Sequence, residues 1–316
     1  MALKQAIEIY EALDSPRANG QRVKGIFGSR GVEVEVQTVE SGTGSTDFVR
    51  IVLAGRQGKS TGGSAPTLGV IGRLGGIGAR PEALGLVSDA DGAITALATG
   101  LKLADMAREG DQTEGDVMIA THICPNAPTI PHEPVPFMGS PVDIATMNAL
   151  EVSDTMDVIL SIDTTRGNWV INRRGFAITP TVKEGYILKV SPSLLNLMSY
   201  VTGQPPSVVP ITTQDITPYG NGVDHVNSIL QPATATDAPV VGVALTSELP
   251  VPGSATGANQ IVDIEMATRF CIEVAKAFGA ARCAFYDRQE FARLVELYGP
   301  MTHLQTLGRA EASPSA

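Results

Sequence analysis

Short apolar segments that alternate with helical segments are the feature that most constrains the fold of this chain. Four such segments, at 65–72, 117–123, 157–163 and 239–245, have the length and the apolar content of buried strands. Because alternating strands and helices are typical of parallel sheets, we expect a single α/β domain. This domain would have three layers, with a mixed, mainly parallel central sheet, helices on both faces and these four segments as neighbouring strands.

The remaining segments complete this expected domain. Two further strands are predicted at 32–39 and 47–55, and helices at the amphipathic N-terminus, from Gly92 to about Arg108 and at 261–279. With 43% hydrophobic residues, the chain of 316 residues can bury one large core. We therefore expect one domain over residues 1–306 and a disordered tail over 307–316.

Composition excludes several classes of partner. The formal net charge is −10 and no Lys/Arg-rich run occurs, which argues against a nucleic-acid partner. No apolar run has the length of a membrane span, and the N-terminal sequence MALKQAIEIYEAL lacks the pattern of a signal peptide. The three scattered cysteines suit reduced thiols. A cytoplasmic protein without a membrane partner is the expectation.

A Pro-rich segment at 125–141 separates two of the predicted strands. Its six prolines and its lack of helical or strand periodicity predict a long ordered loop. Unless another surface covers them, Phe137 and Met138 in this loop would be exposed. Because exposed apolar patches mark contact surfaces, we expect a homo-oligomer.

Acidic residues mark the junction between a predicted strand and a long helix. In the sequence GLVSDADGAITALATGLKLADM, residues 85–106, Asp89 and Asp91 lie directly before the helix. Ligands and metals bind at the carboxyl ends of strands in open α/β sheets, so both carboxylates are candidates for a site. An alternative for Asp91 is that it N-caps the helix.

Two other predicted strands also end in polar residues, namely His122 and Asp163. Together with Asp89, they are two carboxylates and an imidazole at the carboxyl ends of adjacent parallel strands. Such a set can hold one divalent metal, zinc in particular, with open positions for water and substrate. The alternatives are a hydrogen-bonded core histidine and carboxylates that cap helices.

The glycine-rich segment at 69–81 does not fit a dinucleotide site, because no helix begins directly after its glycines. Close backbone packing explains its glycines. Arg73, within this segment, is expected to point into the crevice at the strand end and to bind a substrate carboxylate.

Acid–base and substrate-binding candidates lie in the connecting segments. Because histidine exchanges protons near neutral pH, His132 and His225 are candidates for acid–base catalysis, with Asp91 as a third. A backbone hydrogen bond within a loop or turn is the alternative for each histidine. The candidate substrate-binding residues are Thr164, Thr165, Asn168 and Asp215, in polar clusters whose alternative role is turn formation.

Two of these segments resemble a known group of enzymes. Asp89 in SDADGA and Asp163 in DVILSIDTTRGN occupy the positions of two metal-binding aspartates in the co-catalytic zinc aminopeptidases of the glutamyl- and tetrahedral-aminopeptidase group. The resemblance implies a zinc-aminopeptidase-like fold. The segments THICPNAPTIPHEPVPFMGSP, GFAITPTVKEGYI and QDITPYGN further resemble an uncharacterised bacterial and archaeal family known only as a domain of unknown function.

The chain departs from the aminopeptidase pattern at three positions. It has Arg73-Leu74-Gly75 in place of a His-x-Asp motif, and Thr121-His122 in place of a Glu-Glu pair. Near the last expected histidine it has only PVPGSATGAN. The usual general base and at least two ligands are therefore missing, and a two-zinc mechanism does not carry over.

Two functions remain open on the sequence. One is a metal-dependent hydrolase of a small amide, cyclic or peptide-like substrate, with a one-metal variant of the aminopeptidase site. The other is a non-catalytic protein that binds an amino acid or peptide on a degenerate peptidase fold.

Overall fold

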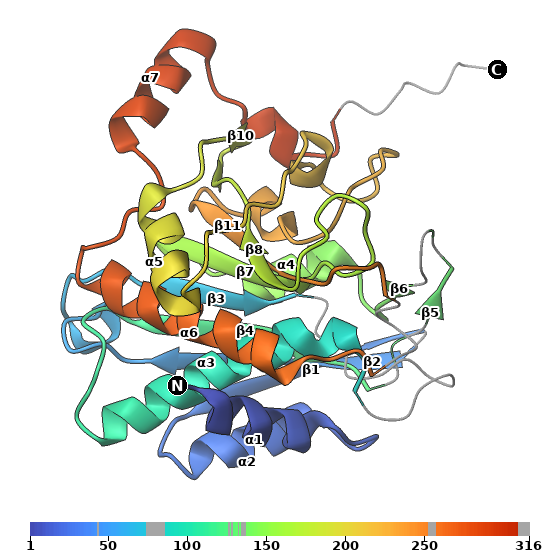
Figure 1. Cartoon of the computed structure of the whole chain (residues 1–316), viewed down its shortest axis with the longest axis vertical. Helices are drawn as coiled ribbons and strands as arrows, with labels where there is room; N and C mark the ends of the chain where they lie inside the picture. The colour runs from blue at the N-terminus through green and yellow to red at the C-terminus, as the bar shows by residue number, and fades with distance from the viewer. Residues whose placement is uncertain are drawn as a thin grey trace.

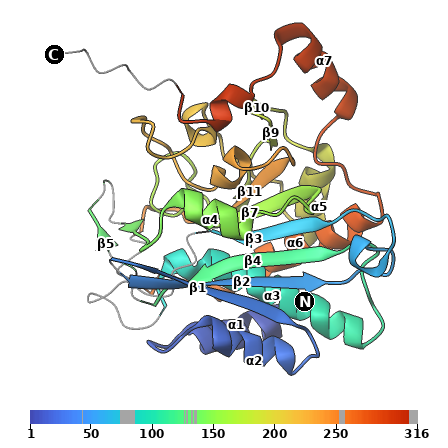
Figure 2. The same cartoon turned by 180° about the vertical axis from the view of Figure 1, so that it is seen from behind.

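A nine-stranded sheet forms the centre of the molecule (Figures 1 and 2). A computed structural model of the protein describes residues 1–42, 44–73, 86–125, 127, 129–131, 133, 137–251 and 257–308. The strands follow the order β1-β2-β4-β3-β7-β11-β9-β10, and β8 also pairs with β11. Their bounds are β1 Val34–Ser41, β2 Gly44–Leu53, β3 Leu68–Gly72, β4 Val117–Ile123, β7 Val158–Thr164, β8 Gly175–Ile178, β9 Val182–Lys183, β10 Tyr186–Ile187 and β11 Val240–Thr246.

The four predicted neighbouring strands form the parallel centre of this sheet. β3 pairs in parallel with β4 on one side and with β7 on the other, and β7 pairs in parallel with β11. Antiparallel strands complete both edges, with β1 and β2 beside β4 and with β8 and β9 beside β11. The predicted mixed, mainly parallel sheet is thus confirmed. A separate two-stranded ribbon joins β5 (Thr129–Ile130) and β6 (Phe137–Met138).

Helices cover one face of the sheet (Figure 1). They are α1 Leu3–Leu13, α2 Gly20–Gly28, α3 Asp91–Arg108, α5 Pro192–Thr202 and α6 Ile261–Gly279. α3 packs on β3, β4 and β7, α6 packs beside α3, and α1 and α5 pack against this pair. The apolar strand residues on this side, such as Val70 and Leu160, join the large core cluster.

The opposite face carries a second apolar cluster that includes Ile71 and Ala244. One regular helix, α4 (Ile144–Glu151), lies on this side, together with the short 3-10 turns η3 (Gln214–Ile216) and η4 (Gln231–Thr234). Because strand side chains alternate between faces, adjacent residues such as Val70 and Ile71 enter different clusters. The three layers are as predicted, with irregular chain forming much of the second outer layer.

Glycines bring the start of α3 against the strand ends. A Cβ atom built on Gly72 would lie 2.6 Å from the backbone oxygen of Gly92, and one on Gly92 would lie 2.8 Å from the backbone oxygens of Arg73 and Ile162. The 3-10 turn η2 (Ser88–Ala90) and the first turn of α3 are therefore held at the carboxyl edge of β3 and β7. The N-cap of α3 is Ala90, without a side-chain cap, so the capping role considered for Asp91 is wrong.

The C-terminal part of the described chain extends from the body. α7 (Arg288–Tyr298) lies beside β10 at one end of the molecule (Figures 1 and 2), where Phe291 packs against Tyr186, and its eleven residues include no buried one. A further 3-10 turn, η5 (Thr302–Gln305), follows it, and η1 (Lys59–Thr61) lies in the Gly/Ser-rich loop after β2. The expected tail lies mostly outside the described residues.

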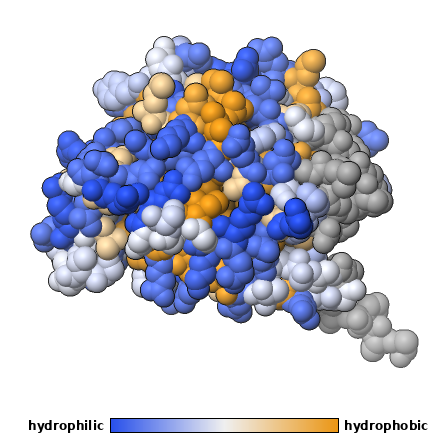
Figure 3. Space-filling view, turned by 90° about the horizontal axis from the view of Figure 1, so that it is seen from below, coloured by the Kyte–Doolittle hydropathy of each residue, from blue (hydrophilic) through white to orange (hydrophobic). Residues whose placement is uncertain are grey.

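None of the described helices is long and apolar enough to cross a membrane. The face seen in Figure 3 is mainly hydrophilic, with separate apolar areas.

Candidate functional site

A cavity of about 580 Å³ opens at the carboxyl edge of β7. Three segments surround it: residues 163–168 at the end of β7, residues 219–228 on the irregular face, and residues 139–147 around the start of α4. Asp89 and Val251 also line its wall. Polar residues at the strand end thus meet apolar residues such as Met147 across one cavity.

Asp163 is the buried acid of this cavity. Its carboxyl accepts hydrogen bonds from the backbone N–H of Thr164 at 2.7 Å and from the hydroxyl of Ser228 at 3.0 Å. Burial raises the pKa of Asp163 to about 6, although these two hydrogen bonds act in the opposite direction. The group can therefore change its protonation state near neutral pH.

Arg73 and His122 share a buried partner, Glu151, at the end of α4. Nη1 of Arg73 donates to Oε2 of Glu151 at 2.6 Å, and Nδ1 of His122 lies 2.6 Å from Oε1 of the same carboxylate. Burial raises the pKa of Glu151, but the charges and hydrogen bonds of Arg73 and His122 outweigh this effect and hold it below its usual range. All three side chains are almost fully buried.

This cluster corrects the expectation for Arg73. The residue is fully buried, pairs with Glu151 and is not among the residues that line the cavity, so it does not face a ligand there. Glu151 had no signal in the sequence, because it lies at the end of a short helix after the Pro-rich loop. Only the three-dimensional structure, in which the end of α4 lies against Arg73 and His122, shows that Glu151 is their shared partner.

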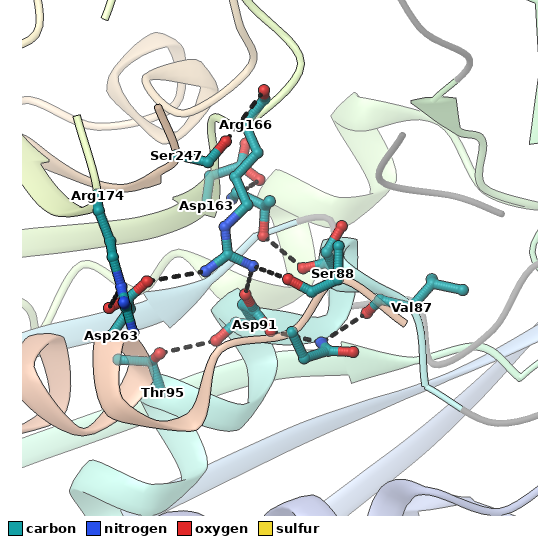
Figure 4. Close-up of polar contacts among 12 residues, drawn as sticks. Val87, Ser88, Asp91, Thr95, Asp163, Arg166, Arg174, Ser247 and Asp263 are labelled. Carbon is teal, nitrogen blue, oxygen red and sulfur yellow. Dashed lines mark hydrogen bonds and ion pairs between the residues drawn. The ribbon is translucent and has the colours of Figure 1, made fainter. Parts of the chain in front are cut away.

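Asp91 belongs to a second buried network, around Arg166 (Figure 4). Arg166 donates to Asp91 and, at 2.9 Å, to the backbone oxygen of Ala258, while Asp263 of α6 lies 3.8 Å from its Nη2. Asn259 also donates to Asp91. Burial raises the pKa of Asp91 to about 6, and Arg166 and Asn259 act against this effect. Asp91 does not line the cavity, so its predicted catalytic role is not supported.

The loop after α5 carries Asp215 and His225. Asp215 accepts hydrogen bonds from the backbone N–H groups of Thr212, Val226 and Asn227 and is fully buried. It holds the loop together and is absent from the cavity lining, which corrects the predicted substrate-binding role. His225 does line the cavity, and its ring packs against Tyr219 with centroids 4.3 Å apart.

The three candidates at the end of β7, Thr164, Thr165 and Asn168, all line the cavity. Thr164 donates through its hydroxyl to the backbone oxygen of Ser88 at 2.8 Å. The side chain of Asn168 donates to the backbone of Thr165 and accepts from the backbone of Val170 and Ile171. Thr165 is buried, and its hydroxyl has no hydrogen-bond partner among the described residues.

The described residues do not form a metal site. Among the described residues, no group of three or more His, Cys, Asp and Glu side chains could hold a metal ion. His122 is engaged with Glu151, and Asp163 with Ser228 and Thr164, so the predicted set of Asp89, His122 and Asp163 is not assembled as a metal centre. His132 lies outside the described residues.

Comparisons with known proteins identify the family and the fold. Residues 37–308 match the family model described as "Protein of unknown function (DUF1177)", and the chain belongs to this family. No curated protein matches it. The structure is similar to that of leucine aminopeptidase from Caenorhabditis elegans, with 12% sequence identity, a TM-score of 0.53, and coverage of 87% of this chain and 67% of that chain.

An M17 aminopeptidase from Trypanosoma brucei is similar over 85% of this chain and 61% of its own, with 11% identity and a TM-score of 0.49. The chain thus spans about two thirds of the leucine aminopeptidase chain and less of the second one. At these identities the likeness concerns the fold alone. The likeness to leucine aminopeptidase confirms the α/β fold of aminopeptidase type, and the family model confirms the membership of an uncharacterised family that the sequence indicated.

Proposed function

We propose that the cavity beside β7 binds a small amine-bearing ligand, an amino acid or a peptide-like molecule, through Asp163. The observation that carries this proposal is the environment of the Asp163 carboxyl. It is 2% exposed, it lines the cavity, and among the described residues no Lys, Arg or His forms an ion pair with it. A buried carboxylate is stabilised by a cation, and an ammonium group of a ligand supplies one.

The charges around the cavity support a cationic ligand. Four aspartates line it, namely Asp89, Asp143, Asp163 and Asp224. Among the described lining residues the one arginine, Arg166, is directed to Asp91 and Asp263, so its charge is largely compensated. The acidic lining therefore attracts a positively charged group.

The test uses the one tryptophan of the chain. Trp169 follows the cavity residue Asn168 and is 69% exposed, so its fluorescence reports on ligand binding at this wall. Amino-acid amides and dipeptides should give saturable changes, whereas their N-acetyl forms, which lack the ammonium group, should not. Asp163→Asn should abolish the response, and Asp224→Asn, at an exposed position of the same cavity, serves as the matched control. Equal responses to the amines and to their N-acetyl forms would contradict the proposal.

Metal-dependent hydrolysis of a small amide is the second candidate. It is favoured by one observation, that Asp89 and Asp163 line the same cavity of an aminopeptidase-like fold. Zinc content, measured in protein purified without chelator, separates the candidates together with a hydrolysis screen of small amides and dipeptides. Stoichiometric zinc that is lost in Asp89→Ala would support the hydrolase, and wild-type protein without zinc would support the binding protein.

A further inference from the structure

Two side chains of one loop, both in the wall of the cavity, each carry a buried polar atom without a hydrogen-bond partner among the described residues. His225 and Asn227, two residues apart, both line the cavity. Nε2 of His225 lies 2.9 Å from the backbone oxygen of Thr217, and Oδ1 of Asn227 accepts from the backbone N–H of Ile229 at 3.0 Å. The other polar atom of each side chain, Nδ1 of His225 and Nδ2 of Asn227, is buried without a hydrogen-bond partner among the described residues.

The first contact sets the tautomer of His225. A carbonyl oxygen only accepts hydrogen bonds, so Nε2 carries the hydrogen. In the neutral ring Nδ1 then holds a lone pair and acts as an acceptor. For Asn227 the assignment is the reverse, because the oxygen accepts from a backbone N–H and the NH₂ group remains as a donor.

A buried polar atom without a partner destabilises the protein, so a ligand that pairs both atoms gains binding free energy. Thr165, which is 4% exposed and lines the same cavity, adds a third unpaired atom, its hydroxyl oxygen. An acceptor and a donor together match a group that offers both an N–H and a C=O. An amide is such a group.

We infer that His225 and Asn227 make the cavity selective for ligands that carry an amide with a free N–H. Nδ1 of His225 accepts the amide N–H, and Nδ2 of Asn227 donates to the amide oxygen. This inference rests on the proposed function, in which Asp163 binds the ammonium group of the same ligand. Because both atoms are buried, this inference requires residues 217–228 to shift when the amide enters; the hydrogen bond from the backbone N–H of Val226 to Asp215 ties the end of this segment to a residue just before its start.

The affinity test compares two probes of nearly equal shape, an amino-acid N-methylamide and the methyl ester of the same amino acid. The ester keeps the ammonium group and the C=O but lacks the N–H. We expect the ester to bind at least about tenfold more weakly to the wild type, because a site built to hydrogen-bond an N–H rejects the analogue without it. A difference below about threefold would overturn the inference.

Two variants assign the roles. His225→Phe keeps the ring beside Tyr219 and should bring the two affinities to within about threefold of each other. Asn227→Asp keeps an oxygen for Ile229 and should weaken both probes together, because both contain the C=O. An unchanged ratio in His225→Phe would contradict the assigned role of His225. The fold of each variant is checked by thermal unfolding.

A measurement without an amine separates this inference from the proposed function. In ¹⁵N spectra of histidine-labelled protein, His225 should be the Nε2–H tautomer, and its Nδ1 signal should shift with N-methylacetamide but not with methyl acetate. The signal is assigned by its loss in His225→Phe. A Nδ1–H tautomer, or equal shifts with both probes, would overturn the inference even if amines bind through Asp163. Conversely, a selective shift together with no binding of amines would refute the proposed function alone.

Discussion

The buried carboxyl of Asp163, the proposed binding group, lowers the stability of the protein near neutral pH. Its carboxyl is fully buried, and its pKa rises from the ordinary value of 3.8 to about 6 in the folded chain. The folded protein therefore binds more protons than the unfolded chain between these values. This difference in proton binding stabilises the folded state fully below pH 3.8, and the stabilisation is lost as the pH rises through about 6.

Replacing this carboxyl should stabilise the protein near neutral pH. The shift corresponds to about 3 kcal/mol, so Asp163→Asn should raise the free energy of unfolding at pH 7.5 by up to this amount. The amide can still accept from Thr164 and contact Ser228. Urea unfolding measured across the pH range checks this, and the gain should disappear below about pH 4. A loss of stability at pH 7.5 would show that burial of the charge is not the dominant effect.

The same pKa predicts how ligand binding depends on pH. An ammonium group binds the ionised carboxylate, so the affinity of an amino-acid amide should be full above about pH 6 and should weaken as the pH falls below this value. Titrations of tryptophan fluorescence at several pH values measure this dependence. An affinity that is constant between pH 5 and 7.5 would exclude Asp163 as the group that binds the amine.

Arg166 connects several elements, because its buried guanidinium lies between the start of α3, α6 and the segment at Ala258 (Figure 4). Arg166→Met leaves Asp91 and Asp263 buried without this cation, and should destabilise the protein by about 3–5 kcal/mol. Arg174→Met is the control, since Arg174 also contacts Asp263 but is 60% exposed, and its loss should cost about 1 kcal/mol or less. Denaturant unfolding compares the two, and similar losses would refute the central role of Arg166.

Glycine positions test how closely α3 lies against the strand ends. Gly92→Ala places a methyl group 2.8 Å from two backbone oxygens and should destabilise the fold and disturb ligand binding at the adjoining edge. Gly25→Ala is the matched control in α2. Its methyl group has no neighbour within 4 Å, so it should stabilise the helix by about 0.5–1 kcal/mol. Thermal unfolding of both variants measures the contrast, and a neutral Gly92→Ala would contradict the close approach.

The elements that sequence could predict are those with a local pattern. The apolar runs gave the four central strands, and the acids before α3 and after β7 were correctly placed at the carboxyl edge of the sheet. The ion-pair partners of these residues were not predictable, because each ion pair joins residues that are distant in the sequence. Arg73 and Glu151 are 78 residues apart, and Arg166 and Asp91 are 75 residues apart. The sequence therefore located Arg73 and Asp91 at the edge, whereas the structure places both in buried ion pairs and outside the cavity lining.

For the whole molecule, assembly into a homo-oligomer remains a prediction. The side chains of Phe137 and Met138, on which it was based, lie outside those that the structure describes. Size-exclusion chromatography with light scattering should give a mass that is a multiple of the chain mass of 33.0 kDa. A mass of one chain at micromolar concentration would contradict it.

We propose that the Asp163 cavity binds an amine without a metal. Calorimetric titration of chelator-treated protein with an amino-acid N-methylamide measures this binding. We expect saturable binding at one site per chain, with the same affinity before and after chelation, and its loss in Asp163→Asn while the variant remains folded. Binding that disappears with the chelator and returns with zinc, or that persists in Asp163→Asn, would contradict it.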